Sequence, residues 1–168
     1  LAHTYGVSLN DLTDALASFQ GTVRRLEVVG WQKGVLIIDD YAHHPTEIRA
    51  SLAALRESYP RRHIVCVFQP HTFSRTAALL GDFASSWQDA HELILLDIFG
   101  SAREQKGSVS SDTLAEKVLE YNNHVLCLKG PDEAIRYLRE KLHDGDILIT
   151  MGAGETWKVA EALNAYLA

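Results

Sequence analysis

Three short segments of the chain collect side chains that could bind a ligand or react, and each follows an apolar run. They read DDYAHHP at residues 39–45, QPHTFSR at 69–75 and MGAGETW at 151–157. Carboxylates accept hydrogen bonds, imidazoles exchange protons near neutral pH, and a guanidinium pairs with carboxylate or phosphate groups. The segments therefore suit a site for a small polar ligand or, more simply, polar loops leaving a sheet.

The segment DDYAHHP is partly explained as the start of a helix. Pro45 suits the first helical position and makes the preceding residue extended, while Glu47 complements the positive helix N-terminus. The start of a helix does not explain four other side chains of this segment: Asp40, Tyr41, His43 and His44. Adjacent histidines can bind metal, but the chain lacks the paired ligand spacing of a zinc site, so no metal site is predicted.

Arg75 stands in the first turn of a predicted helix. The helix macrodipole disfavours a cation there by up to about 1 kcal/mol, so an arginine in this position favours a bound anion. The alternative is a structural ion pair with a neighbouring carboxylate, such as Asp82 or Asp97.

The segment MGAGETW places Gly152 and Gly154 between an apolar strand and a helix. Glycines there could turn backbone N–H groups toward a carboxylate or phosphate, although a tight turn explains them equally well. The chain contains no G-x-x-x-x-G-K-[ST] phosphate loop and no G-x-S-x-G elbow, and neither cysteine lies in a loop beside a histidine. Covalent hydrolase chemistry is not indicated, and no residue is assigned to catalysis.

The elements that position these segments alternate between strands and helices. Ser8 caps a short leading helix with Leu9, Leu12, Leu16 and Phe19 on one face, ended by Gly21, and residues 24–39 predict a hairpin around Gly30–Gly34. The remaining elements follow in order: helix 45–58, strand 62–68, a helix from about 74 with Leu80, Phe83, Ala84 and Trp87 inward, strand 92–98, a helix from Ser110 or Ser111 through Tyr121, strand 124–128, a helix from Pro131 ended by Gly145, strand 146–150 and a final helix.

This alternation of strands and helices predicts an α/β fold with a doubly wound, mainly parallel, Rossmann-like sheet. Ligands of such sheets bind beyond the carboxyl ends of the strands, which is where all three segments fall.

Composition limits the remaining possibilities. The 168 residues are 46% hydrophobic, which predicts one compact domain with an appendage. A net charge of −6 without a basic stripe argues against nucleic-acid binding, and the lack of any apolar stretch of about 20 residues argues against a membrane span. We expect a cytoplasmic protein with Cys66 and Cys127 reduced, and a chain that starts at Leu1 as a piece of a longer one.

Five segments taken in order resemble the carboxy-terminal domain of the Mur ligases, and among them the alanine-adding branch: FQGTVRRLEVVG, DDYAHHPTEI, VFQPHTFSRT, DIFGSARE and MGAGETW. These ligases form amide bonds in peptidoglycan synthesis. The resemblance implies that residues 1–21 are the tail of a central ATPase domain and that 22–168 are the carboxy-terminal domain. It also implies that the phosphate loop lies upstream and that this piece alone is inactive.

The resemblance further implies ligands and residue roles. The full-length enzyme would use ATP with Mg²⁺, UDP-N-acetylmuramate and L-alanine through an acyl phosphate, and the piece alone would bind none tightly. The ATP-binding residues would be Arg25 at the phosphates, Asp40 at the ribose, and Tyr41 and His44 at the edge. The amino-acid pocket would hold His43, Arg75, Gly152 and Gly154. Some family members carry an arginine where this chain has Thr72, so a second arginine for the carboxylate is missing.

Two alternatives remain open at this point. A phospho-receiver signalling domain also has an acidic pair after one strand and an aspartate after another, as Asp39, Asp40 and Asp97 do here. A receiver domain would also require a lysine after its last strand, where this chain has Thr150, Met151 and Gly152. A nucleotide-binding module without catalysis differs from the ligase domain only by the ordered set of motifs.

Overall fold

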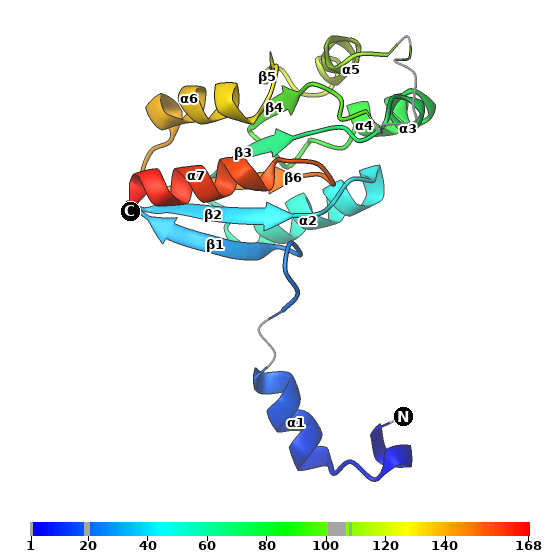
Figure 1. The fold of residues 1–168 in the computed structure, drawn as a ribbon, viewed down its shortest axis with the longest axis vertical. Coiled ribbons are helices and arrows are strands. Elements are labelled where there is room, and N and C mark those ends of the chain that lie inside the picture. Colours follow the sequence, from blue (N-terminus) through cyan, green and yellow to red (C-terminus); the bar gives the residue numbers. More distant parts are fainter. Residues whose placement is uncertain (1, 19–20, 101–106, 108) are drawn as a thin grey trace.

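In the part of the chain that the structure describes, a six-stranded sheet is covered by helices on both faces (Figure 1). The structure is a computed structural model, and it describes residues 2–18, 21–100, 107 and 109–168. The strands are β1 (Glu27–Gln32), β2 (Val35–Asp40), β3 (His63–Phe68), β4 (Glu92–Leu96), β5 (Val125–Leu128) and β6 (Asp146–Met151). The helices are η1 (Ala2–Tyr5), α1 (Leu9–Ser18), α2 (Pro45–Ser58), α3 (Phe73–Ala78), α4 (Leu80–Ala84), α5 (Ser111–Val118), α6 (Pro131–Lys141) and α7 (Trp157–Leu167).

The strand order is β1-β2-β6-β3-β4-β5, and every neighbouring pair is parallel except β1 with β2. The last strand of the chain therefore lies between β2 and β3. From β5 the chain returns across the sheet to β6, and the loop after β6 leads to the opposite face from the loops after β2 and β3. The carboxyl end of β6 is therefore the switch point where ligands of this fold class bind. The prediction of a doubly wound, mainly parallel α/β sheet is confirmed.

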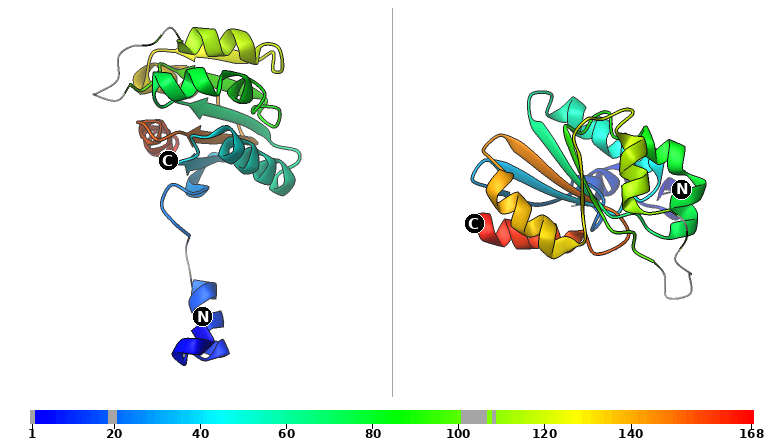
Figure 2. Two further views of the ribbon diagram at one scale, coloured as in Figure 1. Left: turned by 90° about the vertical axis from the view of Figure 1, so that its right-hand side faces the viewer. Right: turned by 90° about the horizontal axis from the view of Figure 1, so that it is seen from above.

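Two apolar cores, one on each face of the sheet, follow from the alternation of side chains along the strands. Leu36 and Ile38 of β2 pack with α2, α4 and α5, whereas Val35 and Ile37 pack with α6 and α7. Figure 2 shows α6 and α7 on one side of the strands and α2 and α5 on the other. Burial on both sides explains why these strands are apolar without interruption.

The predicted hairpin is present, but its turn is shorter than the sequence suggested. Lys33 and Gly34 form the turn with positive φ of 48° and 81°, the conformation of a two-residue hairpin loop. Gly30, Trp31 and Gln32 belong to β1, and a register shift between Val28 and Gly30 marks a bulge in that strand. The sequence suggested a turn at Trp31 because it stands between Gly30 and Gly34, whereas in the structure it is a strand residue whose ring stacks on Arg62.

Several helix boundaries differ from the prediction. The helix expected from residue 74 is broken at Leu79 into α3 and α4, and Trp87 is buried beyond the end of α4. The helix from Pro131 ends at Lys141 because Leu142 is extended, and Gly145, with φ of 95°, belongs to the turn before β6. The helix from residue 111 ends at Val118, and β4 ends at Leu96.

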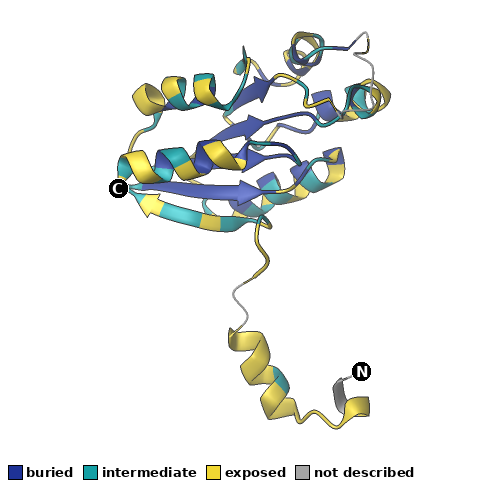
Figure 3. Cartoon of the chain, viewed as in Figure 1, coloured by how far each residue is buried: buried dark blue, intermediate teal, exposed yellow. Residues whose placement is uncertain are grey.

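Helix α1 buries none of its residues, whereas each of the helices α2 to α7 buries at least one. Figure 3 shows α1 coloured almost entirely as exposed. Leu9 and Leu16 of the predicted apolar face are among its exposed residues. Phe19 and the residues 101–104 of the DIFGSARE segment lie outside the described residues. No helix in the described part is long and apolar enough to cross a membrane.

The buried Trp87 gives a test of the fold. Its ring centroid lies 4.9 Å from that of Phe68, and the side chain is fully buried. We expect Trp87→Ala to lower the free energy of unfolding by about 3–5 kcal/mol, since it removes a large core side chain. Trp31→Ala, at a tryptophan that is 53% exposed, should cost less than about 1 kcal/mol. Urea unfolding of both variants measures the difference, and equal losses would contradict this packing.

Candidate functional site

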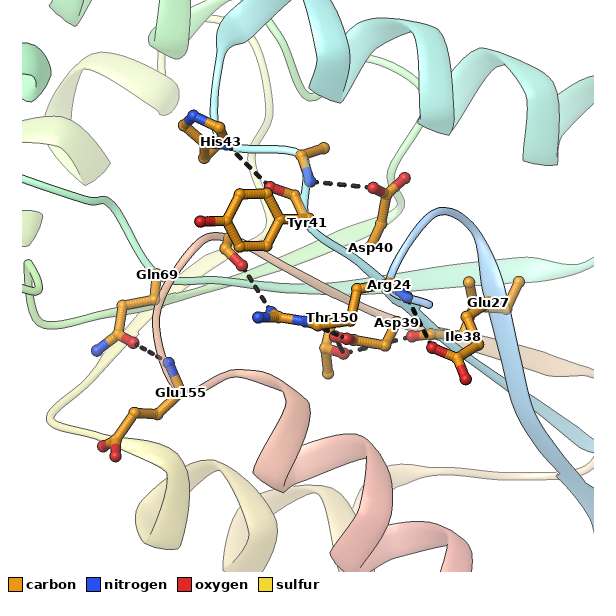
Figure 4. A network of polar contacts seen from close by, with 12 residues as sticks. Arg24, Glu27, Ile38, Asp39, Asp40, Tyr41, His43, Gln69, Thr150 and Glu155 are labelled. Atoms are coloured by element: carbon orange, nitrogen blue, oxygen red, sulfur yellow. Dashed lines mark hydrogen bonds and ion pairs between the residues drawn. The ribbon is translucent and has the colours of Figure 1, made fainter. Parts of the chain in front are cut away.

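Three loops meet at the carboxyl edge of the sheet, as the sequence predicted. They follow β2, β3 and β6 and begin at Tyr41, Gln69 and Gly152. Backbone hydrogen bonds join them, because the N–H of Gly152 donates to the carbonyl of Asp40 at 3.2 Å and that of Gln69 donates to the carbonyl of Met151 at 3.2 Å. Figure 4 shows the polar network that surrounds this junction.

Arg24 holds the network together. Its Nε donates to Asp39 at 2.7 Å and its Nη2 donates to the carbonyl of Gly152 at 2.8 Å. Asp39 also accepts a hydrogen bond of 2.6 Å from the hydroxyl of Thr150 in β6. The arginine thus ties the segment before β1 to the ends of β2 and β6. This role was not predicted from the sequence, although opposite charges at Arg24 and Asp39 flank the predicted hairpin.

The two adjacent aspartates of β2 face opposite sides of the sheet. Asp39 faces the α7 side with Arg24, whereas Asp40 accepts from the backbone N–H of Ala42 at 3.0 Å and from the hydroxyl of Ser51 on α2 at 2.6 Å. Two such carboxylates cannot share one magnesium ion, which argues against the receiver-like alternative. In the described residues no group of three or more His, Cys, Asp or Glu side chains could hold a metal ion.

Arg25 points away from Arg24 and lines a cavity of about 300 Å³ together with Asp40, Glu47 and Ser51. Asp40 is only 3% exposed, and each of its oxygens already accepts one hydrogen bond. An ionised carboxylate offers about four acceptor positions, so this group can still receive a hydroxyl from the cavity. The structure therefore places Arg25 and Asp40 at the same cavity.

His43 and His44 sit at the start of α2, with Glu47 below them. Glu47 accepts from the backbone N–H groups of both histidines, at 3.0 and 3.2 Å, and His44 is the extended N-cap that Pro45 predicted. Burial alone would raise the pKa of Glu47. The two backbone hydrogen bonds and the electrostatic attraction of the neighbouring His43 and Arg25 side chains outweigh it and hold the pKa of Glu47 below its ordinary value.

The rings of Tyr41 and His43 touch edge to face, with centroids 5.2 Å apart. The guanidinium of Arg24 lies 5.1 Å from the centre of the Tyr41 ring, and Tyr41 is 37% exposed. Three of the predicted site residues, Tyr41, His43 and His44, thus lie in the loop between β2 and α2, and a fourth, Asp40, is the last residue of β2.

The glycines of the β6 loop are needed for a close approach. Gly152 has a φ of 130°, and a Cβ there would lie 2.8 Å from the carbonyl oxygen of Gln69. Gln69 was not singled out by the sequence, yet its side chain accepts from the N–H of Glu155 at 2.9 Å and donates to the carbonyl of Asp97 at 3.2 Å. The N–H of Gly152 is used by Asp40, whereas those of Ala153 and Gly154 have no partner among the described residues.

Arg75 is the third residue of α3, in its first turn as predicted, and because α3 has only six residues Arg75 belongs to the last turn as well. The structure records no ion pair between its guanidinium and Asp82, Asp97 or any other described residue. Thr72 caps the same helix by accepting from the N–H of Arg75 at 3.4 Å, and its own φ of 68° is rare for a residue with a side chain. The structural ion pair that could have explained Arg75 is absent from the described part.

Comparison with known proteins places the chain in a family. Residues 24–154 match the family model described as "Mur ligase, glutamate ligase domain". The chain belongs to the Mur ligase family. This Mur ligase domain is 44% identical over 155 residues to a UDP-N-acetylmuramate–L-alanine ligase of Clostridium kluyveri, an alignment that covers 92% of the chain and 34% of that protein. The chain thus spans about a third of the length of the curated relatives it matches.

Solved structures share the fold of this Mur ligase domain. A UDP-N-acetylmuramate–alanine ligase from Thermotoga maritima superposes with a TM-score of 0.80 at 23% identity, covering 98% of this chain and 35% of that one. A domain of a putative ligase from Haemophilus ducreyi, described as acting with UDP-N-acetylmuramate and a tripeptide, gives a TM-score of 0.65 at 26% identity. That match covers 86% of this chain and all of the other, so the Haemophilus domain was solved by itself.

The two neighbouring arginines of the Mur ligase domain should behave differently when they are removed. Arg24→Ala leaves the buried carboxylate of Asp39 without its ion-pair partner, and we expect it to cost about 3 kcal/mol of unfolding free energy. Arg25→Ala, its matched control, should cost little because Arg25 is exposed. Thermal or urea unfolding measures both, and an Arg24→Ala variant as stable as the wild type would contradict this role.

Proposed function

We propose that the chain is the carboxy-terminal domain of a longer ATP-dependent ligase, which joins L-alanine to UDP-N-acetylmuramate in peptidoglycan synthesis. The observation that carries the proposal is the 44% identity over 92% of the chain to the Clostridium kluyveri ligase of that name. Residues 1–21 are then a linker and the tail of the preceding domain, in keeping with an α1 that buries nothing here. Because ATP and nucleotide sugars are intracellular compounds, we propose a cytoplasmic location.

The reaction divides the work between domains. ATP phosphorylates the carboxylate of UDP-N-acetylmuramate, and the amine of L-alanine then displaces phosphate from the acyl phosphate. We assign the phosphate loop and the Mg²⁺ ligands to the rest of the longer chain, since this sequence contains no phosphate-loop motif. The present domain closes over the nucleotide and presents the amino acid, so the domain by itself binds ATP weakly and does not ligate.

We propose that the nucleotide lies on the α2 side of the β2 loop. Arg25 offers a fork of donors to phosphate, and Asp40 offers its remaining acceptor positions to the ribose hydroxyls from the same cavity. Tyr41 and His44 border this position from the loop. His44 accepts the N–H of Thr46 through Nδ1 at 3.3 Å, so its neutral ring carries hydrogen on Nε2 and presents a donor to ligand oxygens.

We propose that the amino acid lies between the loops after β2, β3 and β6. Arg75 receives the carboxylate, since its guanidinium has no ion-pair partner among the described residues. The backbone around Gly152 and Gly154 supports the same carboxylate, with the N–H of Gly154 available and that of Gly152 already used by Asp40. His43 faces the pocket from the β2 loop.

Removing Arg75 tests the amino-acid side. In the full-length parent, Arg75→Ala should raise the KM for L-alanine about 10- to 100-fold, since a charge-assisted pair with a carboxylate contributes about 1.5–3 kcal/mol. The KM for ATP should not change. Steady-state ADP release with UDP-N-acetylmuramate measures both, and Arg61→Ala, an exposed arginine before β3, is the matched control. Wild-type kinetics for alanine in Arg75→Ala would remove Arg75 from the site.

Removing Arg25 tests the nucleotide side. Arg25→Ala in the same full-length enzyme should raise the KM for ATP about tenfold and leave the KM for L-alanine unchanged, because the guanidinium is proposed to contact phosphate only. The same variant should keep its stability, which separates a binding loss from unfolding. An unchanged KM for ATP would show that this cavity does not hold the nucleotide.

A further inference from the structure

His43 and His44 are adjacent, yet their hydrogen bonds fix opposite tautomers. Nδ1 of His43 lies 3.0 Å from the carbonyl oxygen of Tyr41, and a carbonyl can only accept, so Nδ1 carries the hydrogen. The Nε2 of a neutral His43 is then a free lone pair. His44 is the reverse, because its Nδ1 accepts from Thr46. The loop thus presents one proton acceptor beside one donor.

The surroundings of His43 suit a ring that takes up a proton. The second group near Nδ1 is the carboxylate of Glu47, at 3.5 Å, which stabilises an imidazolium by charge attraction. Of the described residues, the titratable groups recorded against the ring are Glu47 from α2 and Tyr41 from its own loop, while Arg25 acts on Glu47 from the segment before β1. The His43 side chain is 24% exposed, so the ring is held by its neighbours and still open to a ligand.

The proposed reaction needs such an acceptor. The α-amino group of an amino acid is protonated near neutral pH and has no lone pair for attack. We propose that Nε2 of His43 is the general base that deprotonates the incoming amino acid, and that Glu47 positions His43 by holding its Nδ1–H side. This inference rests on the proposed ligase function and adds a role beyond binding.

The protons and electrons of the step balance. Nε2 of His43 takes one proton from the ammonium, and the freed nitrogen lone pair forms the C–N bond with the acyl carbon. The bond from that carbon to the phosphate oxygen breaks, and phosphate leaves with the electron pair. The second proton on nitrogen passes to solvent, and the imidazolium returns its own proton to solvent before the next turnover.

A His43→Gln variant of the full-length parent separates this role from simple binding. The backbone N–H that bonds Glu47 is kept. We expect kcat to fall at least about 100-fold at neutral pH, the usual contribution of general base catalysis, with little change in the KM for L-alanine. The deficit should narrow as pH rises, because a growing fraction of alanine is then already a free amine. His63→Gln, an exposed histidine at the opposite edge of the sheet, should keep the wild-type kcat.

Glu47→Gln tests the positioning role. The amide oxygen can still accept the two backbone N–H groups, but the negative charge beside the ring is lost. We expect kcat to fall while the KM for L-alanine stays near its wild-type value, because the charge that supports the imidazolium is lost, whereas a mere helix cap would lower stability and leave kcat unchanged.

The outcomes distinguish this inference from the function on which it rests. No alanine-dependent product from the wild-type enzyme would overturn the proposed function itself. Normal ligation by the wild type, together with a His43→Gln variant that raises only the KM for alanine, would make His43 a binding residue. A kcat deficit that is constant across pH would likewise overturn its role as a base.

Discussion

The ion pair between Arg24 and Asp39 is the constraint on which the arrangement of the site depends. Asp39 is 3% exposed, and a carboxylate buried to that extent without a partner would be strongly destabilising. Arg24 supplies the partner and in addition binds the carbonyl of Gly152, while its own carbonyl accepts the N–H of Tyr41 at 2.8 Å. One residue before the sheet thereby fixes where the β2 loop and the β6 loop begin.

The functional groups gather at this edge because of the strand order. With β6 inserted between β2 and β3, the loops that carry His43, Gly154 and Arg75 leave three neighbouring strands in the order β2, β6, β3. The first and third loops lead to helices on one face and the middle loop leads to α7 on the other. An opening between loops that diverge in this way is where this class of sheet accepts ligands.

The sequence was sufficient for the fold class, since buried apolar strands alternate with amphipathic helices almost without exception. It was also sufficient for the carboxyl-edge location of the three loops and for the place of Arg75 in a first turn. The insertion of β6 could not be seen, because strand order depends on tertiary packing and leaves no local pattern. Trp87 was misplaced for a related reason, since its burial against Phe68 is decided by the core after α4 has ended.

The different roles of Arg24 and Arg25 could not be predicted from the sequence. The two residues are identical in type and adjacent, yet Arg24, with a positive φ of 57°, lies on the α7 face and Arg25 lines the cavity beside α2. Gln69 was not predicted as a site residue, because its side chain bridges two loop backbones. An uncharged amide in the sequence does not indicate such a bridge. The proposed ligand roles of Arg25, Asp40, His43 and Arg75 rest on chemistry and family likeness, and they stay predictions.

The most direct test is a structure of the full-length enzyme with ADP, Mg²⁺ and L-alanine bound. We expect the carboxylate of alanine to lie against the guanidinium of Arg75, its nitrogen within hydrogen-bond reach of His43 Nε2, and the nucleotide beside Arg25 and Asp40. Alanine bound by other domains, with Arg75 and His43 left facing solvent, would contradict it.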